Sequence, residues 1–193
     1  SKKIKTSEQK LYHECLEIAN RLKRRRVSDN EERNGDTDTG FPVKQRVGKT
    51  LRIFLSYSTE DKELAGSIKI NLENKFGLEV FLAHEDIRPS SEWQDEIVRN
   101  LESMDVFVPI ITENFKHSDW TDQESGVAFS LGKMIVPLAI DVSPYGFIGR
   151  YQALRFNRSD LSTSCERIIS SIKEKHPEYA DNLTDSLIRA FSN

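Results

Sequence analysis

The feature that most constrains the fold is a run of six residues, Val106-Phe107-Val108-Pro109-Ile110-Ile111, that is apolar at every position. A strand with one face in water alternates apolar and polar side chains, whereas a strand that is covered on both faces does not. We therefore predict that residues 104–111 form the central strand of a parallel sheet with helices on both faces.

From residue 51 onward, short apolar runs alternate with segments of helical periodicity, which is typical of a parallel α/β sheet. Strands are predicted over residues 51–57, 78–82, 104–111 and 134–140, with a short fifth strand over 153–156. Helices are predicted over 60–75, from a cap at Ser90 or Ser91 onward, and over 118–132, 163–175 and 179–191. Right-handed crossovers then give a flavodoxin-like three-layer fold with strand order 2-1-3-4-5.

Ligands of such sheets bind beyond the carboxyl ends of the strands, next to the switch point between the first and third strands. Four segments are predicted to face that crevice: residues 56–58, 83–89, 112–120 and 141–149. The candidate functional residues are therefore expected in these segments.

Three further parts are predicted around the sheet domain, which spans residues 51–158. Residues 1–26 form an N-terminal amphipathic helix, whose apolar stripe predicts a helical contact with a partner. The stripe consists of Leu11, Cys15, Ile18 and Leu22. Residues 27–50 form a flexible linker, because residues 28–40 contain no apolar side chain that burial could use to offset ordering entropy. Residues 159–193 form a C-terminal helical extension.

Charge and composition exclude several classes of function. Residues 1–50 carry 13 Lys or Arg and 8 Asp or Glu, whereas residues 51–193 carry 15 and 23. The acidic main domain is not expected to bind nucleic acid, because such affinity comes from neutralising phosphates. The longest apolar runs are strand-sized, so no membrane span is predicted. Cys15 and Cys165 lack the spacing of a disulfide framework or a metal site. We predict a cytoplasmic protein without a metal.

Familiar nucleotide-binding and phosphate-accepting motifs are missing from the sequence. Gly48-Lys49-Thr50 resembles the end of a phosphate-binding loop, but Val43 stands where a glycine is needed and a strand follows instead of preceding it. No GxGxxG follows a predicted strand, so a Rossmann dinucleotide site is unsupported. The third strand ends at Ile110-Ile111-Thr112 without an aspartate, which disfavours a response regulator.

The pair Trp120 and Glu124 is the strongest candidate site. The two residues lie one helical turn apart, and Val127 and Leu131 continue the same face, so a carboxylate falls on or beside an apolar stripe. Two interpretations remain open: a peripheral glutamate that bends out to solvent, and a carboxylate in an aromatic-lined cleft suited to a cationic glycosidic centre.

Four segments in a fixed order carry a family resemblance. They are residues 52–58 followed by Glu60-Asp61-Lys62, the loop 82–89, the strand 105–112, and Ser118-Asp119-Trp120 with Glu124. With these segments, residues 51–156 resemble a Toll/interleukin-1 receptor (TIR) domain, in particular the prokaryotic NAD-cleaving type. Residues 1–50 and 159–193 lie outside the resemblance.

The resemblance implies one of two functions. Some TIR domains cleave NAD, as substrate and not as cofactor, at the nicotinamide–ribose bond to give ADP-ribose or its cyclic form. Others only assemble signalling complexes through TIR–TIR contacts. In the first case Glu124 corresponds to the catalytic glutamate and Trp120 to the tryptophan one turn before it. The resemblance also implies a homo-oligomer, with the pocket formed between subunits, in prokaryotic immune or stress signalling.

Further residues are predicted to bind the substrate. Ser56, Tyr57 and Ser58 end the first strand and are candidates to contact the nucleotide, and Arg88 is a candidate to meet a phosphate. Asp86, Ser118 and Trp120 complete this set. Structural alternatives stay open for several of them: strand-end capping for Ser56 and Ser58, loop fixation for Asp86 and a packing anchor for Trp120. Transfer of a glycosyl group from another base is a third functional hypothesis.

Overall fold

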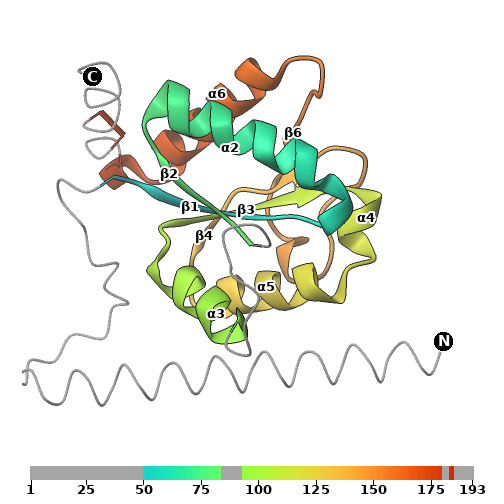
Figure 1. Ribbon diagram of the computed structural model, residues 1–193. Coiled ribbons are helices and arrows are strands. Elements are labelled where there is room, and N and C mark those ends of the chain that lie inside the picture. The colour runs from blue at the N-terminus through green and yellow to red at the C-terminus, as the bar shows by residue number, and fades with distance from the viewer. Residues whose placement is uncertain (1–49, 84–92, 180–182, 185–193) are drawn as a thin grey trace, which may run out of the picture. The chain divides into compact units, whose positions relative to one another are not determined.

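The computed structural model describes residues 50–83, 93–179 and 183–184 (Figure 1). The strands are β1 (Arg52–Ser56), β2 (Glu79–Leu82), β3 (Val106–Ile111), β4 (Met134–Ile135), β5 (Leu138–Ala139) and β6 (Leu154–Arg155). The α-helices are α2 (Lys62–Phe76), α3 (Trp93–Ser103), α4 (Glu113–Lys116), α5 (Asp119–Ser130) and α6 (Leu161–Lys175). Three 3-10 turns, η1 (Thr59–Asp61), η2 (Gly146–Ile148) and η3 (Pro177–Tyr179), complete the elements. Within this described part, no helix has the length and apolar character needed to cross a bilayer.

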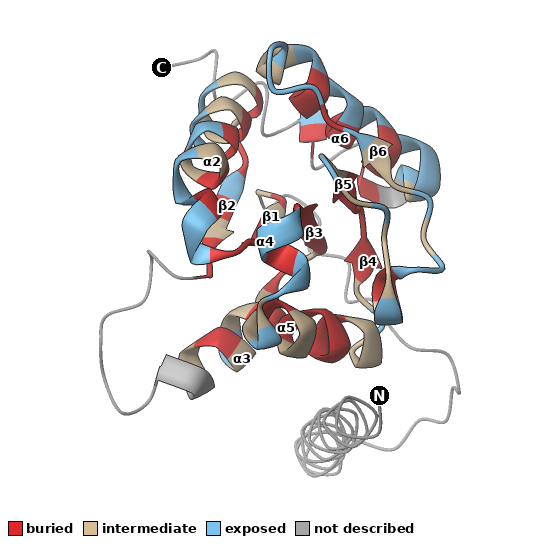
Figure 2. Cartoon of the chain, turned by 90° about the vertical axis from the view of Figure 1, so that its right-hand side faces the viewer, coloured by how far each residue is buried: buried red, intermediate tan, exposed pale blue. Residues whose placement is uncertain are grey.

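The sheet has the predicted topology. Its strands run in the order β2-β1-β3-β5-β6, and β4 also pairs with β3. All pairings are parallel. The central strand β3 is buried at all six positions, as expected for a strand covered on both faces (Figure 2). The flavodoxin-like fold is confirmed.

One predicted strand is divided in two. The sequence predicts a continuous strand over residues 134–140, but the structure has β4 and β5 with a break at Val136 and Pro137. Both pieces keep one register against β3, so that Pro137 lies opposite Pro109. Neither proline has an N–H to donate to the ladder, which explains the interruption.

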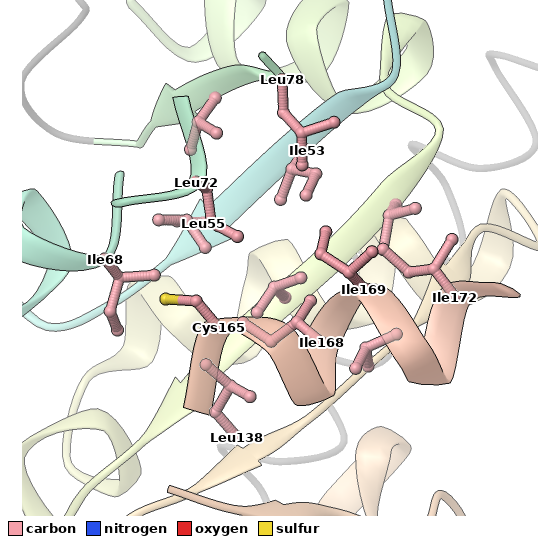
Figure 3. Close-up of a cluster of buried hydrophobic side chains, with 14 of the residues drawn as sticks. Ile53, Leu55, Ile68, Leu72, Leu78, Leu138, Cys165, Ile168, Ile169 and Ile172 are labelled. Atoms are coloured by element: carbon pink, nitrogen blue, oxygen red, sulfur yellow. The ribbon is translucent and has the colours of Figure 1, made fainter. Parts of the chain in front are cut away.

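The two faces of the sheet are covered by different helices, α2 and α6 on one side and α3 and α5 on the other (Figure 1). Ile53 and Leu55 of β1 join the cluster beneath α2 and α6, together with Leu72 and Ile168 (Figure 3). Phe54 is also fully buried but belongs outside this cluster, and its ring lies 5.1 Å from that of Phe81 and 5.8 Å from that of Phe107. Alternate residues of β1 therefore face opposite layers.

Several element boundaries differ from the prediction. The helix predicted over 60–75 begins with the turn η1 and becomes α-helical at Lys62. It ends at Gly77, whose φ of 62° is left-handed and favours glycine. The short helix α4 was not predicted, although Thr112 caps it by accepting a hydrogen bond from Phe115 N. The predicted N-terminal helix, the linker and most of the predicted helix 179–191 lie outside the described residues.

Candidate active site

Glu124 lies on α5 and is only 1% exposed. Its carboxylate does not bend out to solvent, because Ser56 Oγ donates a 2.5 Å hydrogen bond to Glu124 Oε2. Ser56 is the last residue of β1, next to the switch point with β3. The structure therefore places a buried carboxylate at the carboxyl end of the sheet, where parallel α/β folds bind ligands.

The alternation of side chains along β1 explains why Ser56, and not the adjacent Tyr57, lies on the same face of the sheet as Glu124. Successive residues of a strand point to opposite faces. Ser56 follows Phe54 on the face covered by α5, whereas Tyr57 is fully buried in the cluster on the α2 and α6 side. Of these adjacent predicted residues, Ser56 donates a hydrogen bond to Glu124 and Tyr57 packs in the cluster on the opposite face.

Trp120 and Glu124 lie one turn apart on α5, as the sequence predicts. The Trp120 indole nitrogen is buried, and its interaction with the carboxylate lowers the pKa of Glu124 by less than the Ser56 hydroxyl does. Within the described ranges, Glu124 Oε1 accepts no well-formed hydrogen bond. This oxygen is itself buried, so a ligand hydroxyl could reach its lone pairs only if the neighbouring side chains moved.

The environment of Glu124 favours its neutral form. Burial raises the pKa of Glu124 to about 8, and the interactions with Ser56 and then Trp120 lower the pKa by less than burial raises it. Removing a carboxylate from water disfavours its charged form, whereas hydrogen bonds to that form stabilise it. The group therefore changes charge near neutral pH.

A second group of contacts joins two loops to the start of α5. The hydroxyl oxygen of Tyr145, after β5, lies 3.1 Å from Asp122 Oδ1 and 3.3 Å from the Phe115 carbonyl oxygen, and these two acceptors share its single O–H. Burial and then the Asp122 carboxylate raise the pKa of the Tyr145 hydroxyl, so it remains a donor. Thr121 Oγ1 donates to the same Phe115 carbonyl at 2.7 Å. These contacts fix the first turns of α5, which carry Trp120.

Two other predicted site residues that the structure describes, Ser58 and Ser118, make hydrogen bonds to partners other than Glu124. Ser58 hydrogen-bonds to Glu60, and Ser118 caps α5 by accepting from Thr121 N at 3.4 Å. Asp86 and Arg88 lie outside the described residues. The predicted segment 141–149 includes Tyr145, but sequence reasoning singled out neither Tyr145 nor Asp122, because a tyrosine in a loop after a strand carries no periodic signal.

A cavity of about 400 Å³ opens elsewhere, at the edge strand β2. Its walls include Glu79 and Phe81 of β2, Lys69 of α2 and Asn100 of α3, and no predicted site residue lines it. Over residues 50–83, 93–179 and 183–184, no three His, Cys, Asp or Glu side chains are grouped to hold a metal ion.

Solved structures with a similar fold were found. The TIR domain of the Toll-related receptor TRR-2 from Hydra magnipapillata matches with a TM-score of 0.51 and 16% identity, covering 62% of this chain and 94% of that one. The TIR domains of the activated Roq1 resistosome, which directly recognises the pathogen effector XopQ, match with a TM-score of 0.45 and 15% identity, covering 75% and 86%. No curated protein matches the chain.

A family model described as the TIR domain matches residues 53–169, which is more than half of the chain. This range includes both Ser56 and Glu124 and runs from β1 into α6. The chain belongs to the TIR domain family.

Proposed function

We propose that this TIR domain is an enzyme that cleaves NAD at the bond between nicotinamide and ribose. The observation that carries the proposal is the buried Glu124 carboxylate beside Ser56 and Trp120 at the carboxyl end of β1. The proposal further places the enzyme in the cytoplasm, in prokaryotic immune or stress signalling. Asp86 and Arg88 remain candidates for contacts with the substrate.

The chemistry of NAD requires only one such carboxylate. An ordinary glycosidase needs a second carboxyl group to protonate the departing oxygen. Nicotinamide is bound to ribose as a pyridinium, so it leaves as a neutral molecule without being protonated. The remaining task is to stabilise positive charge at the anomeric carbon, and a preorganised carboxylate in a water-poor site does this well. In our proposal, Glu124 Oε1 accepts a hydrogen bond from a ribose hydroxyl.

Ionisation of Glu124 links this mechanism to substrate binding. A pKa of about 8 leaves the carboxyl mostly neutral at pH 7 in the free protein. A pyridinium cation beside it favours the charged form and lowers that pKa. We therefore expect kcat/KM to rise with pH up to about 8, because this parameter reports ionisation of the free enzyme. Self-association that brings a second copy to the site would complete the pocket.

An incubation with NAD tests the proposal. The wild-type chain, at high concentration and with a crowding agent, is expected to release nicotinamide together with ADP-ribose or cyclic ADP-ribose, separated by chromatography. E124Q keeps the shape but removes the charge, so we expect at least a ~100-fold loss, the size of effect seen when one electrostatic contact to a transition state is removed. The matched control is E63Q, which makes the same substitution at an exposed glutamate of α2 and should retain full activity.

A non-catalytic interaction module is the second candidate function. The observation in its favour is that Glu124 is 1% exposed and already bonded to Ser56, as in a purely structural pair. In that case neither wild type nor E124Q releases nicotinamide, and both self-associate equally in analytical ultracentrifugation. Release of a base from an added nucleoside, but not from NAD, would instead indicate glycosyl transfer on another base.

A further inference from the structure

Asp61 is a second buried carboxylate, and the proposed chemistry does not use it. The residue follows β1 in the turn η1 and is 7% exposed. Thr112 Oγ1 donates to Asp61 Oδ2 at 2.5 Å, and Asn114 Nδ2 donates to Asp61 Oδ1 at 3.2 Å. Both donors belong to the segment that follows β3. Asp61 therefore ties together the two chain segments that leave the sheet on either side of the switch point.

The ordinary role of an aspartate in this position does not explain these contacts. Asp61 is the N-cap residue of α2, where an aspartate side chain normally accepts a hydrogen bond from a backbone N–H of the first turn. Its side chain makes no such capping bond within the described residues. The carboxylate instead accepts a hydrogen bond from Thr112, at the carboxyl end of the sheet.

The contacts continue from Thr112 to the helix that carries Glu124. Thr112 Oγ1 accepts from Phe115 N at 3.0 Å, which sets the start of α4. The Phe115 carbonyl in turn lies 2.7 Å from Thr121 Oγ1, whose O–H it shares with the Ser118 carbonyl at 2.8 Å. Thr121 stands next to Trp120 and three residues before Glu124 on α5. A continuous series of hydrogen bonds thus joins the segment after Ser56 to the first turn of α5.

We propose that Asp61 is a positioning residue that sets the first turn of α5 relative to the end of β1. Ser56 and Glu124 come from these two elements, and their 2.5 Å hydrogen bond requires that the elements keep a fixed spacing. Asp61 controls this spacing from a distance, through Thr112 and Phe115. This inference rests on the proposed NAD cleavage for its kinetic consequence only, and its geometric consequence stands without it.

The test compares D61A with D160A. Asp160 is the N-cap of α6 and accepts from Thr163 N at 3.2 Å, so D160A also removes a helix-associated aspartate but leaves the connection to α5 intact. The sequence has two tryptophans, so the chain gives two indole N–H resonances in a proton–nitrogen correlation spectrum. We expect D61A to shift the Trp120 resonance, assigned with a W120F variant, and D160A to leave it in place.

Kinetics with NAD give a second measurement. D61A is expected to lower kcat ten-fold to a hundred-fold with little change in KM, because a small misplacement of a reacting group has an effect of this order. T112V should act in the same direction, and T112S, which keeps the hydroxyl, should restore both the wild-type kcat and the wild-type Trp120 resonance. N114A truncates an exposed side chain and removes only its hydrogen bond to Asp61, so it is expected to fold and can replace D61A if that variant does not fold.

The outcomes separate this inference from the proposed function. If the wild-type chain does not cleave NAD, the enzyme proposal fails, and the Trp120 resonance still decides the role of Asp61. If D61A, T112V and N114A leave that resonance unchanged, the positioning role is wrong, whether or not NAD is cleaved. If D160A shifts it as far as D61A does, the effect is general destabilisation and the inference is overturned as well.

Discussion

The two faces of the sheet each bury a titratable side chain, with opposite consequences. Cys165 lies in the apolar cluster beneath α2 and α6, and burial raises the pKa of its thiol to about 11. On the α5 face, burial raises the pKa of Glu124 to about 8. The thiol is neutral under ordinary conditions, so its burial adds apolar contact without an electrostatic cost. The glutamate gains its charge near neutral pH while still buried.

This difference separates the part of the domain that stabilises the fold from the part that is suited to chemistry. The cluster on the α2 and α6 face consists mainly of aliphatic side chains from helices and strands, with a few aromatic and sulfur-containing ones. The α5 face combines apolar packing with Ser56 and Glu124. Groups with a strongly shifted pKa cluster at functional sites, because burial that is unfavourable for folding can be useful for reactivity.

A core substitution on the α2 face should have the largest effect on stability. Leu72 is fully buried in the cluster, and L72A leaves a cavity that the surrounding strands cannot fill. We expect a loss of about 2–5 kcal/mol in the free energy of unfolding, measured by urea denaturation. I70A on the same helix is the control, because Ile70 is 60% exposed, and should change stability by about 0.5 kcal/mol or less. Equal losses for both variants would show that this face is not the stabilising one.

E124Q should increase the free energy of unfolding, unlike L72A, and this increase should depend strongly on pH. The pKa of Glu124 is higher in the folded protein than the ordinary value of 4.5, so the folded state binds more protons than the unfolded state. Wild-type stability is therefore lost as pH rises from about 4.5 to about 8, whereas glutamine does not titrate. We expect the free energy of unfolding of E124Q, relative to that of wild type, to be about 3–4 kcal/mol higher at pH 8 than at pH 5.

Thermal and urea unfolding at both pH values measure this difference. The control is E63Q, whose exposed side chain on α2 should show no comparable change between pH 5 and pH 8. A constant difference between E124Q and wild type across this range would contradict a raised pKa at Glu124. The contrast between the two faces would then lose its electrostatic basis.

S56A should have the smallest effect of the three. In wild type, the 2.5 Å hydrogen bond from Ser56 to Glu124 Oε2 lowers the pKa of the carboxyl, and S56A deletes this bond. We expect the pKa of Glu124 to rise further and the free energy of unfolding to fall by about 1 kcal/mol. Carbon-13 NMR of labelled glutamate follows the titration directly. The control is S125A, because Ser125 follows Glu124 and also carries a buried hydroxyl; this variant should leave the pKa of Glu124 unchanged.

The sequence allowed most of the fold to be predicted, because apolar periodicity is a local property. The apolar run of β3 indicated a strand covered on both faces, and the strand order followed from the crossover rule. The break between β4 and β5 was missed because it depends on Pro137 lying opposite Pro109, and only strand pairing places these two residues together. Helix α4 was missed because a single turn has too few residues to show a period.

Within the candidate site, the sequence by itself determined that Trp120 and Glu124 share one face of α5, since helical spacing fixes which residues are neighbours along a helix. Only the tertiary structure decided that Ser56 donates to the carboxylate while Tyr57 packs on the opposite face, and that Asp61 bonds to Thr112 instead of capping α2. Contacts of this kind join residues more than 50 positions apart, and their formation depends on how the layers pack. Burial, which raises the pKa of Glu124, is likewise a property of that packing.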